Sequence, residues 1–179
     1  MMTKDIPVLG FAAWSGTGKT TLLKQLLPSL KKRGVRVGCI KHAHHQFDVD
    51  TPGKDSYELR HAGASQMLIA SEKRWALMVE KPQTEIPSLE NLLGHLDTGQ
   101  LDLILVEGFK SEVFPKIELF RPKLGKPLQY MDDASIIAIA TDQPTGLPDD
   151  VQIPVLDIND INAIESFVCH YTQVRESQG

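Results

Sequence analysis

The stretch Ala13-Trp-Ser-Gly-Thr-Gly-Lys-Thr20 stands between an apolar run and a leucine-rich segment with helical spacing. Two glycines followed by Lys and Thr at this spacing predict a phosphate-binding loop at a strand-to-helix turn. Gly16 and Gly18 let the backbone curl so that successive N–H groups point at phosphate oxygens, and the following helix adds the positive end of its dipole. Ala13 takes the place of the usual first glycine and is small enough to allow the turn.

The loop residues suggest how a nucleotide would be held. Lys19 places an ammonium near the β- and γ-phosphates, and the hydroxyl of Thr20 is a suitable ligand for Mg²⁺. A glycine turn that merely connects a strand to a helix is the alternative. The residues expected to contact the nucleotide are Ser15, Gly16, Thr17, Gly18, Lys19, Thr20 and Thr21.

Apolar runs alternate with segments of helical spacing along most of the chain. This alternation predicts an α/β, P-loop NTPase-like fold, with a doubly wound and mostly parallel sheet flanked by helices. The predicted strands span residues 6–13, 35–41, 101–107, 116–120, 135–140 and 153–156. The predicted helices span residues 19–33, 55–63, 88–96 and 159–173.

A pair of strand-like runs, at residues 66–70 and 74–80, is joined by only three residues. So short a connection predicts an antiparallel hairpin, which we expect to extend the parallel sheet at one edge. The helix that precedes the hairpin begins with Asp55 and Glu58, which are predicted to form a capping pair. Residues 121–133 are rich in Pro, Lys and Gly and are expected to form an exposed loop.

The composition of the 179 residues is that of an ordinary globular protein, with 41% hydrophobic and 23% charged residues. A net charge of −4 argues against non-specific binding to nucleic acid. The sequence has no apolar stretch of membrane-spanning length and no signal-peptide core at its start. Cys39 and Cys169 fit reduced core thiols of a cytoplasmic protein. We expect one nucleotide-binding domain over residues 1–174 and a frayed tail over 175–179.

Acidic residues follow two of the predicted strands, and ligands of such sheets bind at the carboxyl ends of the strands. Glu107 is predicted to hold Mg²⁺ together with Thr20, and capping of the turn at Gly108 is the alternative. Asp48 and Asp50 follow the second strand, where a loop can reach the metal or position the attacking water. Asp50 is the candidate Mg²⁺ ligand of the two, and a solvent-facing acidic turn is the alternative.

Asp142 follows Thr141 at the end of a late strand, where phosphate-loop GTPases commonly place a base-reading Asp. A carboxylate there accepts hydrogen bonds from both N1–H and the N2 amino group of guanine, a pairing that adenine lacks. The full Asn-Lys-x-Asp pattern is missing. The sequence therefore favours guanine without fixing it.

The cluster His42, His44 and His45 is unusual. On an extended chain His42 and His44 project to the same face, which is half of a transition-metal site. Hydrogen bonding of neutral imidazoles to a phosphate or a partner is the alternative.

Three cations outside the loop are candidates for contact with an anionic second ligand or a partner. The alternative is that they only keep the surface soluble. They are Lys110, Arg60 and Arg74. Trp14 and Trp75 are expected to be packing residues, although Trp14 lies within the loop itself.

Four blocks in order are more specific than the loop alone. They are Ala13-Trp-Ser-Gly-Thr-Gly-Lys-Thr-Thr-Leu-Leu23; Ile40-Lys-His-Ala-His-His45 with Asp48-Val-Asp50 and Pro52-Gly-Lys-Asp-Ser-Tyr-Glu-Leu-Arg60; Arg74-Trp-Ala-Leu-Met78; and Leu101-Asp-Leu-Ile-Leu-Val-Glu-Gly-Phe-Lys110. Together they closely resemble the MobB family of molybdopterin-guanine dinucleotide biosynthesis adapter proteins. The resemblance runs from about Ile6 to Phe167 and is weakest between Ser111 and Ala134.

The resemblance implies a cytoplasmic GTP-binding adapter of bacterial molybdenum-cofactor maturation, with weak GTPase activity and with GTP and Mg²⁺ as cofactors. It implies a homodimer formed through extended sheets, with a molybdopterin guanylyltransferase and a molybdenum-insertion enzyme as partners. Gly16 to Thr21 carry over as phosphate contacts, and Thr20 with Glu107 as Mg²⁺ contacts. Asp48 and Asp50 carry over as well, and no general base is assigned.

Two other functions fit a phosphate-binding loop. A small-molecule kinase usually has a lid with several arginines, and the Pro-rich loop offers Arg121. A metallochaperone GTPase would bind Zn²⁺ or Ni²⁺ through His42, His44 and His45. The turnover rate distinguishes a kinase from an adapter, and uptake of Zn²⁺ or Ni²⁺ distinguishes a metallochaperone from an adapter.

Overall fold

The computed structural model describes residues 6–43, 47–81 and 87–173 of the chain. The contacts within the chain divide it into two compact units. The first consists of Met1–His42 with Leu89–Gly179, and the second of Ala43–Ser88. The predicted frayed tail, residues 175–179, lies outside the described residues.

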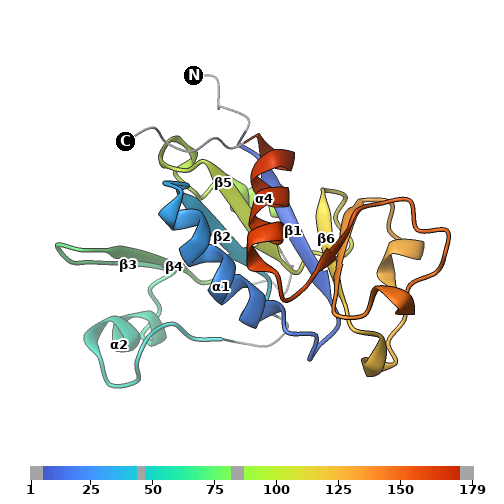
Figure 1. Cartoon of the computed structure of the whole chain (residues 1–179). Helices are drawn as coiled ribbons and strands as arrows, with labels where there is room; N and C mark the ends of the chain where they lie inside the picture. Colours follow the sequence, from blue (N-terminus) through green and yellow to red (C-terminus); the bar gives the residue numbers. More distant parts are fainter. Residues whose placement is uncertain (1–5, 44–46, 82–86, 174–179) are drawn as a thin grey trace. The chain divides into compact units, whose positions relative to one another are not determined.

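The first unit is built on a six-stranded sheet with the order β2-β5-β1-β6-β7-β8, in which every neighbouring pair is parallel (Figure 1). The predicted mostly parallel, doubly wound α/β sheet is confirmed. Its strands are β1 (Val8–Ala13), β2 (Val37–Lys41), β5 (Leu103–Glu107), β6 (Lys116–Phe120), β7 (Ile136–Thr141) and β8 (Val155–Asp157).

Helices cover both faces of this sheet because the side chains of each strand alternate between them. Leu105 of β5 packs with helices α1 (Lys19–Lys32) and α4 (Ile161–Thr172). Figure 1 shows these two helices side by side across one face of the sheet. Ile104, the neighbour of Leu105, packs on the other face with α3 (Leu89–Leu93). The core therefore consists of two apolar layers separated by the sheet.

Helix α1 follows directly from the phosphate-loop sequence and begins after Gly18. Leu22, Leu26 and Leu30 are buried on its inner side, as their helical spacing predicts. The helix continues through Pro28 and ends before Gly34, which has a φ of 77°. Its first turn is thus attached to the core by the leucines that follow it.

The second unit contains α2 (Asp55–His61) and the antiparallel pair β3 (Gln66–Ala70) and β4 (Trp75–Val79). The predicted hairpin is confirmed. It forms a two-stranded sheet of its own, so the expected extension of the parallel sheet is corrected. β3 and β4 pair with each other along one edge, and no described strand of the parallel sheet pairs with the outer edge of either.

The predicted capping pair at the start of α2 is wrong. The N-cap residue is Lys54, which makes no side-chain capping hydrogen bond. Asp55 and Glu58 lie in the first turn, where their charges favour the helix through its dipole rather than through a capping hydrogen bond.

Apolar side chains on the hairpin are unusually exposed. We call them the hairpin patch: Leu68, Ile69, Trp75, Leu77 and Val79, whose exposed fractions range from 44% to 66%. Trp75 is the most exposed of these, so its predicted role as a packing residue is wrong. Exposed apolar surface of this kind is common at sites of interaction.

Cys39 and Cys169 do not form a disulfide with each other. Cys169 is half-buried, whereas Cys39 on β2 is exposed, so the prediction of a core thiol is wrong for Cys39. No helix among the residues that the structure describes has both the length and the apolar character needed to span a membrane.

Strand β6 carries two buried charged residues. Lys116 is 2% exposed, and its ammonium donates to the Glu112 carbonyl (2.6 Å), Ser135 Oγ (2.8 Å) and Asp133 Oδ2 (3.1 Å). Glu118 is fully buried, and its two carboxylate oxygens accept hydrogen bonds from backbone N–H groups of residues 129 and 130, each at 2.7 Å. The segment predicted as an exposed loop, 121–133, is therefore anchored to the sheet at its far end.

We predict that Glu118→Gln removes part of the pH dependence of stability. Burial raises the pKa of Glu118 above its ordinary value of 4.5, although two backbone N–H groups oppose the shift. Since the folded state then holds the proton more tightly than the unfolded chain, the free energy of unfolding falls as pH rises from about 4.5 toward the raised pKa. Glutamine does not ionise and should flatten this decline.

The measurement is urea unfolding of both proteins at a series of pH values, with Glu72→Gln in the exposed hairpin turn as the control. A decline of the same steepness in wild type and Glu118→Gln would contradict the prediction.

Candidate nucleotide-binding site

The loop between β1 and α1 has the backbone geometry that its glycines predict. Gly16 and Gly18 have φ values of 83° and 101°, a region that side-chain-bearing residues rarely adopt. A Cβ at Gly16 would meet nothing within 4 Å, so conformation rather than space requires glycine there. Thr17 is buried and closes the turn, since its hydroxyl donates to the Trp14 carbonyl at 2.8 Å.

Lys19 and Glu107 meet at the carboxyl ends of neighbouring strands. The Lys19 Nζ lies 3.5 Å from Glu107 Oε1, and both side chains are 18% exposed. The Lys41 Nζ lies at the same distance from the same oxygen, but its side chain is 62% exposed. The structure thus brings the predicted phosphate-binding lysine and the predicted metal-binding carboxylate together.

The donor set at this edge suits Mg²⁺. Thr20 and Glu107 offer hydroxyl and carboxylate oxygens, the hard ligands that Mg²⁺ prefers. Among residues 6–43, 47–81 and 87–173, no three His, Cys, Asp or Glu side chains converge on a common point. A magnesium ion held here would therefore take most of its ligands from phosphate oxygens and water, as Mg²⁺ usually does.

The turn after β5 is tightly constrained. Gly108 has a φ of 99°, and a Cβ on it would lie 2.6 Å from the Cβ of His42. The next residue, Phe109, is buried and its ring packs against the His42 ring at a centroid distance of 5.1 Å. His42 therefore has a packing role in the first unit. His44 and His45 lie outside the described residues, so the predicted metal-binding cluster stays a prediction.

Arg121 is a site residue whose position the sequence did not reveal. Its Nε donates to the Thr17 carbonyl of the loop at 2.9 Å, and its guanidinium forms an ion pair with Asp142. The Lys123 Nζ also lies 3.7 Å from Asp142 Oδ2. The signal that could have revealed this contact is positional, because Arg121 and Asp142 each directly follow one of two paired strands, β6 and β7.

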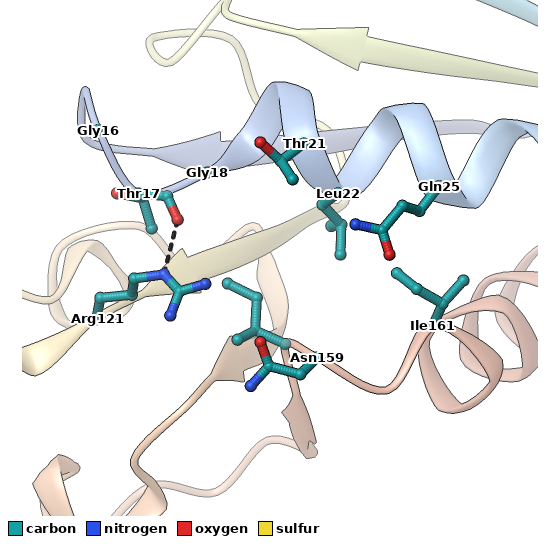
Figure 2. Close-up of a pocket in the computed structure, with 10 residues that line it drawn as sticks. Gly16, Thr17, Gly18, Thr21, Leu22, Gln25, Arg121, Asn159 and Ile161 are labelled. Carbon is teal, nitrogen blue, oxygen red and sulfur yellow. Dashed lines mark hydrogen bonds between the residues drawn. The ribbon is translucent and has the colours of Figure 1, made fainter.

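A cavity of about 430 Å³ opens beside the loop. Figure 2 shows that Arg121 lies between the loop and Asn159, with Thr21 and Gln25 on the helix side. The lining residues are Gly16, Thr17, Gly18, Thr21, Leu22, Gln25, Arg121, Ile158, Asn159 and Ile161. The loop offers N–H groups to phosphates, and the cavity next to it offers amide and guanidinium groups to the rest of a ligand.

Asp48 and Asp50 belong to the second unit, where Arg60 engages both carboxylates. Arg60 Nη2 donates to Asp48 Oδ1 at 2.7 Å, and Arg60 Nε lies 3.6 Å from Asp50 Oδ2. The backbone N–H of Asp50 and the Arg60 guanidinium hold the pKa of Asp48 below its ordinary value. Asp50 Oδ1 also accepts from Ser56 Oγ at 3.0 Å. Arg60, a candidate for an anionic ligand, therefore has acidic partners within its own unit.

Comparison with known proteins gives matches over most of the chain. A sequence model of the family described as MobB, "Molybdopterin guanine dinucleotide synthesis protein B", matches residues 8–142. The chain is 54% identical to the molybdopterin-guanine dinucleotide biosynthesis adapter protein of Escherichia coli (strain K12), with 94% of each chain covered. It is 44% identical to the protein of the same name from Haemophilus influenzae, over 93% of this chain and 90% of that one.

Solved structures show a similar fold. The X-ray structure of a MobB homologue from Bacillus stearothermophilus gives a TM-score of 0.69 at 23% identity, and covers 94% of this chain and 99% of that chain. The structure of Bacillus subtilis MobB gives a TM-score of 0.70 at 20% identity, with 91% and 96% covered. At these identities the likeness concerns the fold.

Proposed function

Because this chain belongs to the MobB family, we propose that it is a GTP-binding adapter protein of molybdopterin guanine dinucleotide biosynthesis, within molybdenum cofactor maturation. Relatives that bear the name of such an adapter match it over more than nine-tenths of its length. In this role the protein would act in the cytoplasm and would assist the enzyme that joins a guanosine nucleotide to molybdopterin. Its partners are then a molybdopterin guanylyltransferase and a molybdenum-insertion enzyme.

The observation that carries the nucleotide-binding part is the approach of Lys19 to Glu107, 3.5 Å apart beside a loop with two left-handed glycines. A cation, a carboxylate and convergent backbone N–H groups are the components that bind a nucleotide triphosphate with Mg²⁺. We propose that residues 15–21 contact the phosphates and that Thr20 and Glu107 hold the metal. Thr20 and Glu107 would hold the ion through hydroxyl and carboxylate oxygens, and a bound Mg²⁺ would supply positive charge that neutralises the phosphates. The assignment of Asp50, which belongs to the second unit, as an Mg²⁺ ligand stays a prediction from the sequence.

Asp142 favours guanine as the base, because the Asp142 carboxylate can accept hydrogen bonds from two adjacent donors of guanine. Both of its cationic neighbours, Arg121 and Lys123, contact the same oxygen, Oδ2. Arg121 lines the cavity beside the loop and donates to Thr17, so we propose that it also contacts the nucleotide. A purine nucleoside in that cavity would lie between Arg121 and Asn159.

An adapter needs a nucleotide-dependent surface rather than rapid turnover. We propose weak GTPase activity, with no side chain assigned as a general base. Arg121 is the arginine that the structure places against the loop, whereas a small-molecule kinase usually has a lid with several arginines. The adapter is therefore favoured over the kinase.

The proposed homodimer would use the face of the hairpin that carries the hairpin patch apart from Ile69, which lies on the opposite face with its register partner Ala76. Trp75, Leu77 and Val79 alternate along β4 and share one face of the hairpin with Leu68, the register partner of Leu77. A second copy of this chain that packs on this face would bury apolar surface that is now exposed. The resemblance to a family that associates through extended sheets favours a second copy as the occupant.

We predict that Lys19→Ala weakens GTP binding roughly 100-fold, or about 2.8 kcal/mol, because it removes the ammonium that faces the phosphates. Titration with GTP in the presence of Mg²⁺ gives the affinity, and thermal unfolding checks the fold. Lys32→Ala, at the other end of α1, is the matched control. Unchanged GTP affinity in Lys19→Ala would overturn the nucleotide-binding proposal.

The same titration with ATP, followed by phosphate release, tests the adapter against the kinase. We expect a clear preference for GTP and turnover well below about one per second, under the range of kinases. Equal affinity for ATP, or faster turnover, would favour the kinase.

We predict that Asp142→Asn lowers the affinity for GTP and raises that for xanthosine triphosphate, because an amide can donate to the additional xanthine carbonyl. Competition titrations with guanosine, inosine and xanthosine triphosphates measure the preference. Arg121→Ala is the control, because it breaks the same ion pair and leaves the carboxylate. A proportional loss for all three nucleotides in both variants would contradict base reading.

We predict that Leu77→Lys weakens the homodimer by about 2 kcal/mol or more, because it places a charge on the apolar interface. Light scattering coupled to gel filtration should give twice the chain mass of 19.9 kDa for wild type, with a shift toward monomer in the variant. Glu72→Lys, in the turn of the same hairpin, is the control. A monomeric wild type, or an unaffected dimer, would contradict the proposed interface.

A further inference from the structure

The backbone after β5 turns sharply just beyond the carboxylate of Glu107. Gly108 and Phe109 both have positive φ, at 99° and 54°. Among the described residues, only Phe109 and Gln173 adopt positive φ without being glycine, and Gln173 caps the end of α4. Such a conformation persists only where the surroundings impose it, and it is concentrated at functional sites. Here the Phe109 ring is buried and packs against the His42 ring.

This turn places Lys110 against the phosphate loop. Its ammonium lies 4.5 Å from the centroid of the Trp14 ring, which belongs to the loop itself. The indole is held in place, because Trp14 Nε1 donates to the Pro127 carbonyl at 2.8 Å. A cation on an indole face is attracted by the ring quadrupole, but this interaction is modest at an exposed site. Lys110 is therefore held next to the loop without a strong anionic partner in that contact.

The electrostatic surroundings of Lys110 favour a negatively charged ligand. Partial burial and the positive charge of Lys19 lower the pKa of Lys110, and the negative charge of Glu118 opposes this shift. Glu107 lies 3.5 Å from both Lys19 and Lys41 and is therefore shared between those two cations. An anion that contacts Lys19 and Lys110 together would relieve their mutual repulsion.

We propose that Lys110 is a second phosphate-binding cation, which moves from the Trp14 ring to the terminal phosphate of the bound nucleotide and so distinguishes a triphosphate from a diphosphate. This inference rests on the proposed nucleotide binding and adds the residue that detects the last phosphate. The four-carbon stem of lysine allows the movement without a change in the backbone. The Trp14 ring would then be the group that Lys110 contacts when no triphosphate is bound, rather than a packing residue.

The first test compares GTP and GDP affinities of wild type, Lys110→Ala and Lys110→Arg. We expect Lys110→Ala to weaken GTP about tenfold, as the loss of one charge-assisted hydrogen bond predicts, and to change GDP less than about twofold. Lys110→Arg keeps the charge and should retain most of the preference. Lys32→Ala controls for the loss of one positive charge far from the loop.

The second readout is the fluorescence of Trp14. The chain has two tryptophans, so a Trp75→Phe background leaves Trp14 as the only one. GTP should change its emission more than GDP does, because only the triphosphate draws Lys110 away from the ring. Lys110→Ala should abolish that difference.

The outcomes separate the two proposals. Equal weakening of GTP and GDP, or no weakening of either, would overturn the role of Lys110 while the nucleotide site stands. An emission change that is the same with and without Lys110 would also overturn it. If wild type binds neither nucleotide, the proposed nucleotide-binding function and this inference both fail.

Discussion

Glu107 on β5 is the register partner of both Phe11 on β1 and Lys41 on β2. This parallel pairing fixes which side chains meet at the carboxyl edge of the sheet, because all three strands end there in the same direction. The loop after β1 and the carboxylate at the end of β5 are brought together by it. A slip of one residue would turn Glu107 to the other face, and the Lys19–Glu107 contact would be lost. The buried apolar layers on both faces hold the register.

The fold could be predicted largely from local patterns. Strands such as β1 and β5 are continuous apolar runs, whereas α1 has leucines at helical spacing. The spacing of the apolar residues and the length of each run therefore distinguish these strands from the helix. The glycines of the phosphate loop were also predictable from the local sequence, because the turn itself requires positive φ values and glycine adopts them readily. The position of the hairpin was not predictable in this way. Its strands pair with each other in a separate two-stranded sheet. Nothing in the local sequence shows whether the outer edge of a hairpin joins a larger sheet.

The contacts that complete the candidate site join distant parts of the chain, which is why the sequence did not reveal them. Arg121 meets Thr17 across 104 positions, and it meets Asp142 only because β6 and β7 are paired neighbours. Likewise, Lys110 reaches Trp14 through a turn in which a phenylalanine adopts a positive φ, and no propensity scale anticipates that conformation. Pattern reasoning thus pointed to the loop and to the carboxylate that lies beside Lys19, whereas the surrounding cations required the tertiary structure.

The 46 residues of the second unit enter the chain between two strands that pair directly with each other, β2 and β5. The described strands of the insertion, β3 and β4, are not part of the hydrogen-bonded ladder of the central sheet. Sequence change in the insertion can therefore alter its exposed apolar side chains without disturbing the strand register that brings Lys19 and Glu107 together. Under the proposed function, association and nucleotide binding would be open to separate selection, although a single chain encodes both.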